Sequence, residues 1–228
     1  MKNTFQALLI AVFAVFSFGA YAAEVREPDN IEAIVKTILP EGAFSEGEPA
    51  FGDLNHDGLP DLAVLVSTGS AEAGPGPELK IFVFLANRNG GYTHFVSSED
   101  VFPHERVHAT LTIEKGILQL NREGSGGCCS RWSEDFKFKM VNGDLVLIGT
   151  EVQSNSLGEK IDDNGASVNF LAKKVIFWRK IGKKRKEVVV ALPPFELLKL
   201  RDFNYSDYDT HLPAQARGYL DEHFLLKQ

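Results

Sequence analysis

The sequence predicts a mainly-β fold built from antiparallel sheets, sandwich-like, with a short helix near the N-terminus and a second helix near the C-terminus. Two observations lead to this prediction. Short apolar and β-branched runs recur from residue 51 to residue 191, and turn sequences such as Asn89-Gly90-Gly91 and Asn142-Gly143 separate them. This regular spacing favours hairpins in antiparallel sheets over strand–helix–strand crossovers.

Helical periodicity is limited to the two ends of the chain. Residues 31–38 carry Ile31, Ile34, Val35 and Ile38 on one face, with Asp29 placed to cap the helix and Pro40 to end it. Residues 213–226 have a weaker helical pattern that Gly218 interrupts. We therefore expect a helix in each segment.

The predicted strands fill most of the chain between these helices. Their alternating or β-branched composition and flanking turn residues set the limits. They are residues 61–67, 79–86, 92–97, 107–113, 117–121, 133–141, 144–153, 168–180 and 187–191.

The first 22 residues have the features of a signal peptide. Lys2 gives a positive start, residues 4–23 carry no charged side chain, and Ala20-Tyr21-Ala22 has the small-x-small pattern of a cleavage site. A retained membrane anchor is the alternative, because about 20 uncharged residues can just span a bilayer. The cleavage triplet favours removal. We expect residues 23–228 to form a single mainly-β domain, periplasmic or secreted, with no transmembrane anchor after cleavage.

Composition excludes several classes of protein. The chain has 24 Lys and Arg against 31 Asp and Glu, a net charge of −7 that becomes −8 when Lys2 is removed. The apolar fraction of 44% and charged fraction of 24% are ordinary, which argues against a disordered or collagen-like chain. The net acidity argues against a general nucleic-acid binder.

The most informative segment is residues 51–64, Phe-Gly-Asp-Leu-Asn-His-Asp-Gly-Leu-Pro-Asp-Leu-Ala-Val. Oxygen-bearing side chains recur in it, at Asp53, Asn55, Asp57 and Asp61, and Gly58 permits a sharp turn. Hard cations such as Ca²⁺ prefer six to eight oxygen ligands. The alternative is a turn whose side chains cap backbone N–H groups without a metal. An EF-hand is not expected, because position 12 of the loop is a valine and not a bidentate glutamate.

This segment resembles the calcium loop of FG-GAP or VCBS-type repeats, the blade units of integrin-like propellers. The resemblance covers residues 49–96, since residues 79–92 resemble the second half of such a unit. It implies Ca²⁺ bound by the side chains of Asp53, Asn55, Asp57 and Asp61 and by the carbonyl of Leu59. His56 is expected to face solvent.

A complete propeller is not expected. It needs about four blades or more, and the calcium-loop signature occurs once in this chain. Asp162-Asp163-Asn164-Gly165 is the only other acidic turn that we expect, and it lacks the alternate spacing. We therefore expect a single blade-like unit within another β domain. Residues 130–138, 143–149 and 167–171 are also similar to secreted bacterial proteins of uncharacterised function, which implies a shared fold and no activity.

Two further features have open interpretations. Cys128 and Cys129 are adjacent and form a vicinal disulfide, an intermolecular bridge or two buried thiols. A basic segment gathers eight cationic residues within fourteen, and it suggests contact with an anionic envelope component or an acidic protein. A solvated hairpin that protects an edge strand is the alternative. The basic residues are Lys173, Lys174, Arg179, Lys180, Lys183, Lys184, Arg185 and Lys186.

The sequence contains no recognisable catalytic constellation. It lacks a Gly-x-Ser-x-Gly elbow, a phosphate-cradling Gly-Lys-Ser loop and a zinc-protease helix motif. Glu134 and Asp135 are adjacent acids, but neighbouring residues of a strand face opposite sides. We therefore expect a non-enzymatic, calcium-binding interaction module of the bacterial envelope. An envelope hydrolase with an unrecognised active site is the alternative.

Overall fold

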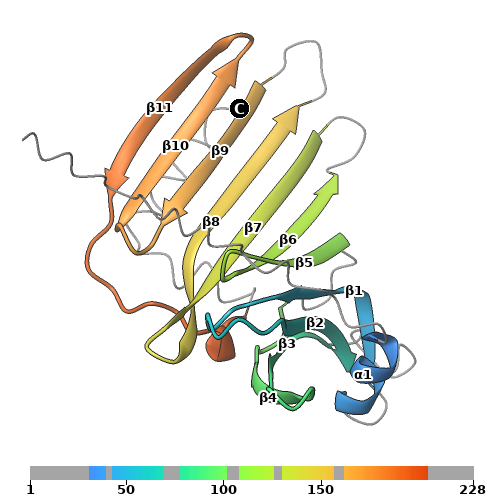
Figure 1. The fold of residues 1–228 in the computed structure, drawn as a ribbon. Coiled ribbons are helices and arrows are strands. Elements are labelled where there is room, and N and C mark those ends of the chain that lie inside the picture. The colour runs from blue at the N-terminus through green and yellow to red at the C-terminus, as the bar shows by residue number, and fades with distance from the viewer. Residues whose placement is uncertain are drawn as a thin grey trace, which may run out of the picture.

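The computed structural model describes residues 31–39, 43–68, 78–101, 108–125, 130–156 and 162–204. It is mainly β, as predicted, and its strands form two antiparallel sheets (Figure 1). The four-stranded sheet contains β1 (Phe44–Gly52), β2 (Asp61–Thr68), β3 (Glu78–Ala86) and β4 (Tyr92–Ser97). The seven-stranded sheet contains β5 (His108–Glu114), β6 (Ile117–Ser125), β7 (Ser130–Val141), β8 (Asp144–Ser156), β9 (Asp162–Asn169), β10 (Lys174–Ile181) and β11 (Lys184–Ala191). The described helices are α1 (Ile31–Ile38) and the short 3₁₀ helix η1 (Leu200–Asp202).

Both sheets are meanders in which each strand pairs with its neighbours along the chain. Two of the predicted turns show why. Lys115-Gly116 joins β5 to β6 and Asn142-Gly143 joins β7 to β8, and all four residues have positive φ. Successive positive φ values are typical of two-residue hairpin turns whose twist matches that of the flanking strands. These turns therefore favour antiparallel pairing of β5 with β6 and of β7 with β8.

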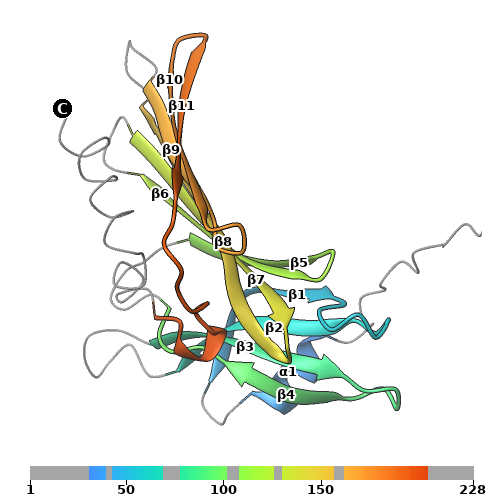
Figure 2. The same ribbon diagram turned by 90° about the vertical axis from the view of Figure 1, so that its left-hand side faces the viewer.

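Strand β2 of the four-stranded sheet is buried on both faces. Ala63 and Leu65 of β2 belong to the main core, which they share with residues of the seven-stranded sheet. Leu62 and Val64 point to the other face, where Val35 of α1 packs against them. Figure 2 shows the four-stranded sheet below the β5 end of the seven-stranded sheet. Because β2 is covered on both sides, it reads as a continuous apolar run instead of an alternating one.

The two sheets approach each other closely at Gly52, the last residue of β1. A Cβ atom added there would lie 2.4 Å from Cγ2 and 2.8 Å from the carbonyl oxygen of Ile113 in β5. Any side chain at this position would collide with the β5 backbone. The glycine of the Phe-Gly-Asp sequence therefore serves the junction between the sheets.

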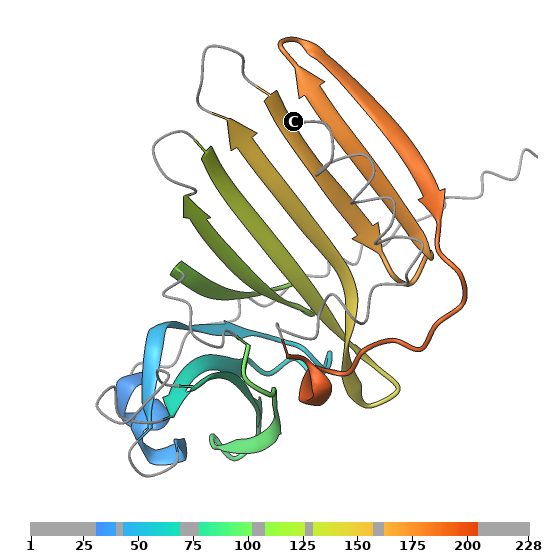
Figure 3. The same cartoon turned by 180° about the vertical axis from the view of Figure 1, so that it is seen from behind.

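After β11 the chain crosses back to the start of β8, as Figure 3 shows from behind. Leu147 donates a backbone hydrogen bond of 2.8 Å to Leu198. Phe203 is fully buried, with its ring centroid 5.2 Å from those of Phe136 and Phe138. Asp144 binds the segment from outside, by ion pairs of 2.9 Å to Lys199 and 2.6 Å to an Arg201 nitrogen.

The prediction of one strand over residues 168–180 is wrong. Residues 170–173 form a turn between β9 and β10. The Asn169 side chain accepts a 2.8 Å hydrogen bond from the Ala172 N–H, and Lys173 has a φ of 51°. Asparagine thus supplies a turn that contains no glycine or proline.

Two other strand assignments also differ from expectation. The expected acidic turn at residues 162–165 lies within β9 instead. β1 was not expected, because its sequence is rich in Gly, Pro and Glu. It is an edge strand whose register with β2 shifts between Glu46 and Ala50, where Gly47 has a φ of 74°. Edge position and irregular pairing tolerate such residues.

Three predicted features lie outside the described residues: the signal peptide over residues 1–22, the Cys128-Cys129 pair and the helix over residues 213–226. Within the described residues, no helix is long and apolar enough to cross a membrane.

Candidate functional site

The acidic loop (residues 53–61) joins β1 to β2 and contains all five predicted ligand residues. Its side-chain oxygens turn back onto the loop's own backbone. Asp53 accepts hydrogen bonds from the N–H groups of Asp57 (3.1 Å) and Gly58 (2.9 Å). Asn55 accepts a second bond from the Asp57 N–H at 3.0 Å, and Asp57 accepts one from the Leu59 N–H at 2.8 Å. The loop is therefore held in a tight turn by its acidic side chains.

Asp61 differs from the other acidic residues because it is fully buried. One carboxylate oxygen accepts the Leu54 N–H at 2.8 Å, within the loop, and the other accepts the Ala86 N–H at 2.9 Å, at the end of β3. Burial raises the pKa of Asp61 above its ordinary value of 3.8; the N–H donors offset part of this rise, while the negative charge of Asp57 adds to it. Asp61 thus joins the loop to β3 through a buried carboxylate whose charge is only partly compensated by N–H donors.

Tyr92 of β4 completes the same region. Its hydroxyl donates a 3.2 Å hydrogen bond to the carbonyl of Pro60. Burial raises the pKa of Tyr92, and the negative charge of Asp61 raises it further. Strands β2, β3 and β4 therefore each contribute a residue that holds the loop.

Two further residues of the loop, Leu54 and His56, also contact the rest of the molecule. Leu54 is fully buried in the main core. His56 is exposed, as predicted, and its φ is 62°. Its ring lies against Gly116 in the β5–β6 turn, where an added Cβ would stand 2.5 Å from His56 Cε1. The loop therefore touches both sheets.

The donor set has the chemistry that calcium prefers. It consists of three carboxylates, the amide oxygen of Asn55 and the carbonyl of Leu59, without nitrogen or sulfur. Each carboxylate oxygen that accepts one N–H retains further acceptor capacity. No ion pair links Asp61 to a cation within the described part of the chain. Among the described residues, however, no three His, Cys, Asp or Glu side chains are grouped to hold a metal. In this structure the acidic side chains cap backbone N–H groups, which is the metal-free alternative that the sequence also allowed.

The basic segment lies mainly on the hairpin formed by β10 and β11, which we call the basic hairpin (Lys174–Ala191). Lys180 Nζ lies 3.8 Å from Oδ2 of Asp163 in β9, and Arg185 Nε lies 2.6 Å from Oε1 of Glu187. The Arg185 guanidinium also stacks on the Trp178 ring at 4.7 Å from the ring centroid. Lys173 stands in the turn before β10. Six of the eight basic residues, Arg179, Lys180 and residues 183–186, are thus brought together at the turn end of the hairpin, whereas Lys173 and Lys174 lie at its other end, where Lys174 is opposite Ala191.

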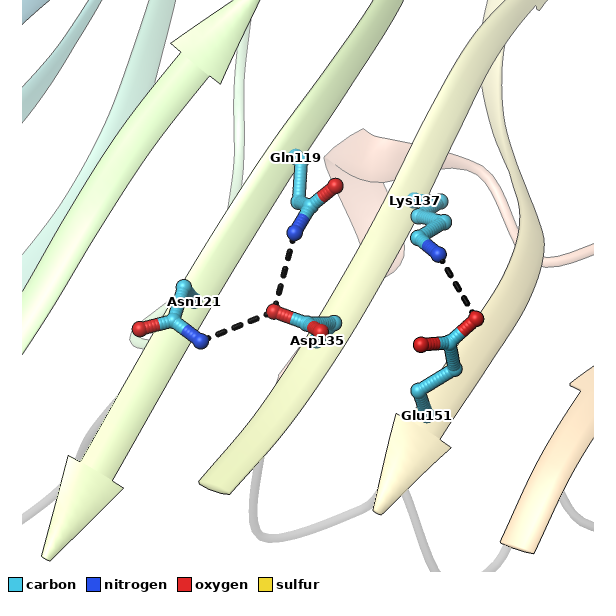
Figure 4. Close-up of polar contacts among 5 residues, drawn as sticks. All are labelled: Gln119, Asn121, Asp135, Lys137 and Glu151. Atoms are coloured by element: carbon cyan, nitrogen blue, oxygen red, sulfur yellow. Dashed lines mark hydrogen bonds and ion pairs between the residues drawn. The ribbon is translucent and has the colours of Figure 1, made fainter. Parts of the chain in front are cut away.

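The seven-stranded sheet has a polar face on β6, β7 and β8 (Figure 4). Asp135 accepts hydrogen bonds from Gln119 (2.9 Å) and Asn121 (2.8 Å) on this face. Its neighbour Glu134 instead forms an ion pair with the buried Arg122, at 3.4 Å between Oε2 and Nη1. The two adjacent acids therefore have separate partners and do not form a carboxylate pair.

A scan against protein-family models, a search of curated proteins and a search of solved structures each found no match to this chain. The loop residues were found from the sequence by their spacing. The contacts of Ala86 and Tyr92 could not be found from the sequence, because both residues come from strands distant along the chain.

Proposed function

We propose that this protein is an exported, non-enzymatic interaction module of the bacterial envelope that binds one Ca²⁺ at the acidic loop. The observation that carries the calcium proposal is the fully buried Asp61 carboxylate, which has N–H donors but no cationic partner among the described residues. A buried carboxylate is costly unless its charge is compensated. Asp53, Asn55, Asp57, Leu59 and Asp61 would hold the ion.

The bound ion would supply positive charge at a place where three carboxylates repel one another. Since the loop contacts both sheets, this compensation would stabilise their junction. We take the role to be structural. At a Kd near ~10⁻⁴ M, millimolar Ca²⁺ would add about 1.4 kcal/mol to the free energy of unfolding.

The proposal is tested by thermal melting in chelator and in millimolar Ca²⁺, for the wild type and for Asp57→Ala. We expect Ca²⁺ to raise the melting temperature of the wild type and to leave that of the variant unchanged. Millimolar Mg²⁺ is the control, because its smaller ion demands near-octahedral geometry and gives up water reluctantly. A wild type whose melting temperature ignores Ca²⁺ contradicts the structural role.

The interaction part of the proposal is supported by the basic hairpin. It carries seven basic residues and one acidic residue on a chain whose net charge is −7. This local excess of positive charge on an acidic chain favours binding to an anionic partner. Replacing Lys183, Lys184 and Lys186 by Ser should reduce retention on bacterial envelope extracts. Unchanged retention would show that the hairpin is not the contact surface.

A further inference from the structure

β11 is an edge strand with an uninterrupted backbone. It pairs with β10 from Lys184 opposite Ile181 to Ala191 opposite Lys174, without a break in register. In the described chain β10 is its only pairing partner, and Figures 1 and 3 show it at the border of the sheet. In an antiparallel strand, about half of the N–H and C=O groups point away from the single neighbour. The outer side of β11 is thus a template for a further strand.

Two of the other three described edges, β1 and β4, have irregular pairing that hinders the addition of a strand, and the third, β5, lies against β1 of the other sheet. β1 has a register shift next to Gly47 and contains Pro49, and the pairing of β4 with β3 shifts between Val83 and Phe84. Bulges and prolines are common means of protecting a sheet edge. β11 has eight residues and neither device.

β11 also carries exposed apolar side chains. Val188 is 44% exposed and Val189 is 56% exposed, and as neighbours in a strand they face opposite sides of the sheet. Exposed valines on a regular edge promote aggregation unless a partner covers them. The apolar half of β11, residues 188–190, is therefore suited to pack against the side chains of an added strand.

The other half of β11, residues 184–186, is basic and therefore favours an acidic partner strand. Lys184, Arg185 and Lys186 follow the turn, and Lys183 stands within it. Arg185 is paired with Glu187, whereas Lys183, Lys184 and Lys186 have no ion pair within the described part of the chain. Like charges placed directly across strands are destabilising, and opposite charges are favourable.

We propose that β11 accepts an extended acidic segment of a partner protein as an additional antiparallel strand, which rests on the proposed function as an interaction module. Antiparallel pairing places the N-terminal part of the partner strand against residues 188–190, where apolar residues are expected, and its acidic C-terminal part against residues 184–186. Backbone hydrogen bonds provide affinity in this mode, and alternate side chains provide specificity. A second copy of this chain would bring two basic hairpins together, and a lipid surface would leave the backbone groups of β11 unpaired.

The test uses a short synthetic peptide with Val-Thr repeats in its N-terminal half and Glu-Thr repeats in its C-terminal half. The control peptide has the same charge, with alternate Thr residues replaced by Pro to prevent strand pairing. Binding is measured by fluorescence anisotropy, and protection of the β11 amides by hydrogen exchange. Lys184→Glu/Lys186→Glu is compared with Lys36→Glu/Arg88→Glu, which changes two exposed cations elsewhere.

We expect the extended peptide to bind and to protect the β11 amides, with affinity about tenfold lower for Lys184→Glu/Lys186→Glu and unchanged for the control variant. Equal binding of both peptides without protection would overturn strand addition and leave the proposed anionic contact standing. Binding only to anionic phospholipid vesicles, or dimerisation that protects β11, would overturn it in favour of a membrane or a second copy. If the protein binds neither peptide nor vesicles and does not dimerise, the proposed interaction role is also wrong. The acidic loop lies against the β5–β6 turn, at the other end of the strand order from β11, so calcium binding is measured separately.

Discussion

Replacement of Asp61 should be the most damaging single change in the acidic loop. Its two carboxylate oxygens accept hydrogen bonds from the N–H groups of Leu54 (2.8 Å) and Ala86 (2.9 Å), and Asp61 itself is fully buried. A buried N–H that loses its acceptor costs about 2 kcal/mol. Asp61→Ala leaves the buried Leu54 N–H and the part-buried Ala86 N–H without an acceptor, so we expect the free energy of unfolding to fall by about 3 kcal/mol. Asp61→Asn retains one acceptor oxygen and should cost less.

The assay is urea denaturation at neutral pH in chelator, which removes any effect of metal binding. Asp53→Ala is the matched control, because Asp53 also accepts two backbone N–H groups, from Asp57 and Gly58, but at an exposed site. Water replaces the lost acceptor there, so the cost should be about 1 kcal/mol. Equal losses for Asp61→Ala and Asp53→Ala would refute the argument from burial.

The same residue predicts a pH dependence. Burial raises the pKa of Asp61 above 3.8 in the folded protein, whereas the unfolded chain keeps an ordinary value. The folded state therefore binds more protons between these two values, and the free energy of unfolding falls as pH rises through that window. In chelator, the wild type should lose stability relative to Asp61→Asn across this range. A difference that does not vary with pH, or that has the opposite sign, would contradict the assignment.

Two further predictions concern the junctions of the fold. Gly52→Ala should lower the free energy of unfolding by about 3 kcal/mol, because its Cβ would collide with Ile113; Gly91→Ala, where an added Cβ has open space, should cost little. Urea denaturation distinguishes them, and equal costs would show that the sheets separate easily. Asp144→Asn should speed hydrogen exchange at the Leu147 amide, because Asp144 anchors the segment that supplies its acceptor. Unchanged exchange would mean that buried packing alone holds that segment.

Local chemistry explains which parts of the fold were predictable. The turn at Asn142-Gly143 was found because its residues favour positive φ. The turn at residues 170–173 was missed because its signal is a single side-chain acceptor, Asn169, within an apolar run. β1 was missed because an edge strand tolerates Pro49 and Gly47, which normally argue against a strand.

The candidate site divides in the same way. The spacing of Asp53, Asn55, Asp57 and Asp61 identified the loop, because those residues are close together in the sequence. The contact from Asp61 to Ala86 and the packing of His56 on Gly116 join segments that only the folded sheets bring together. Sequence spacing therefore located the donors and could not show that one of them is buried.

Direct calcium binding to the purified protein is the measurement that tests the central proposal. Isothermal titration at neutral pH should give one site per chain with a Kd near ~10⁻⁴ M. Asp57→Ala should lose that site, while Asp163→Ala, which removes an acidic residue of β9, should retain it. Absence of saturable binding by the wild type at millimolar Ca²⁺ would contradict the proposal and leave the acidic loop as a turn held by its own hydrogen bonds.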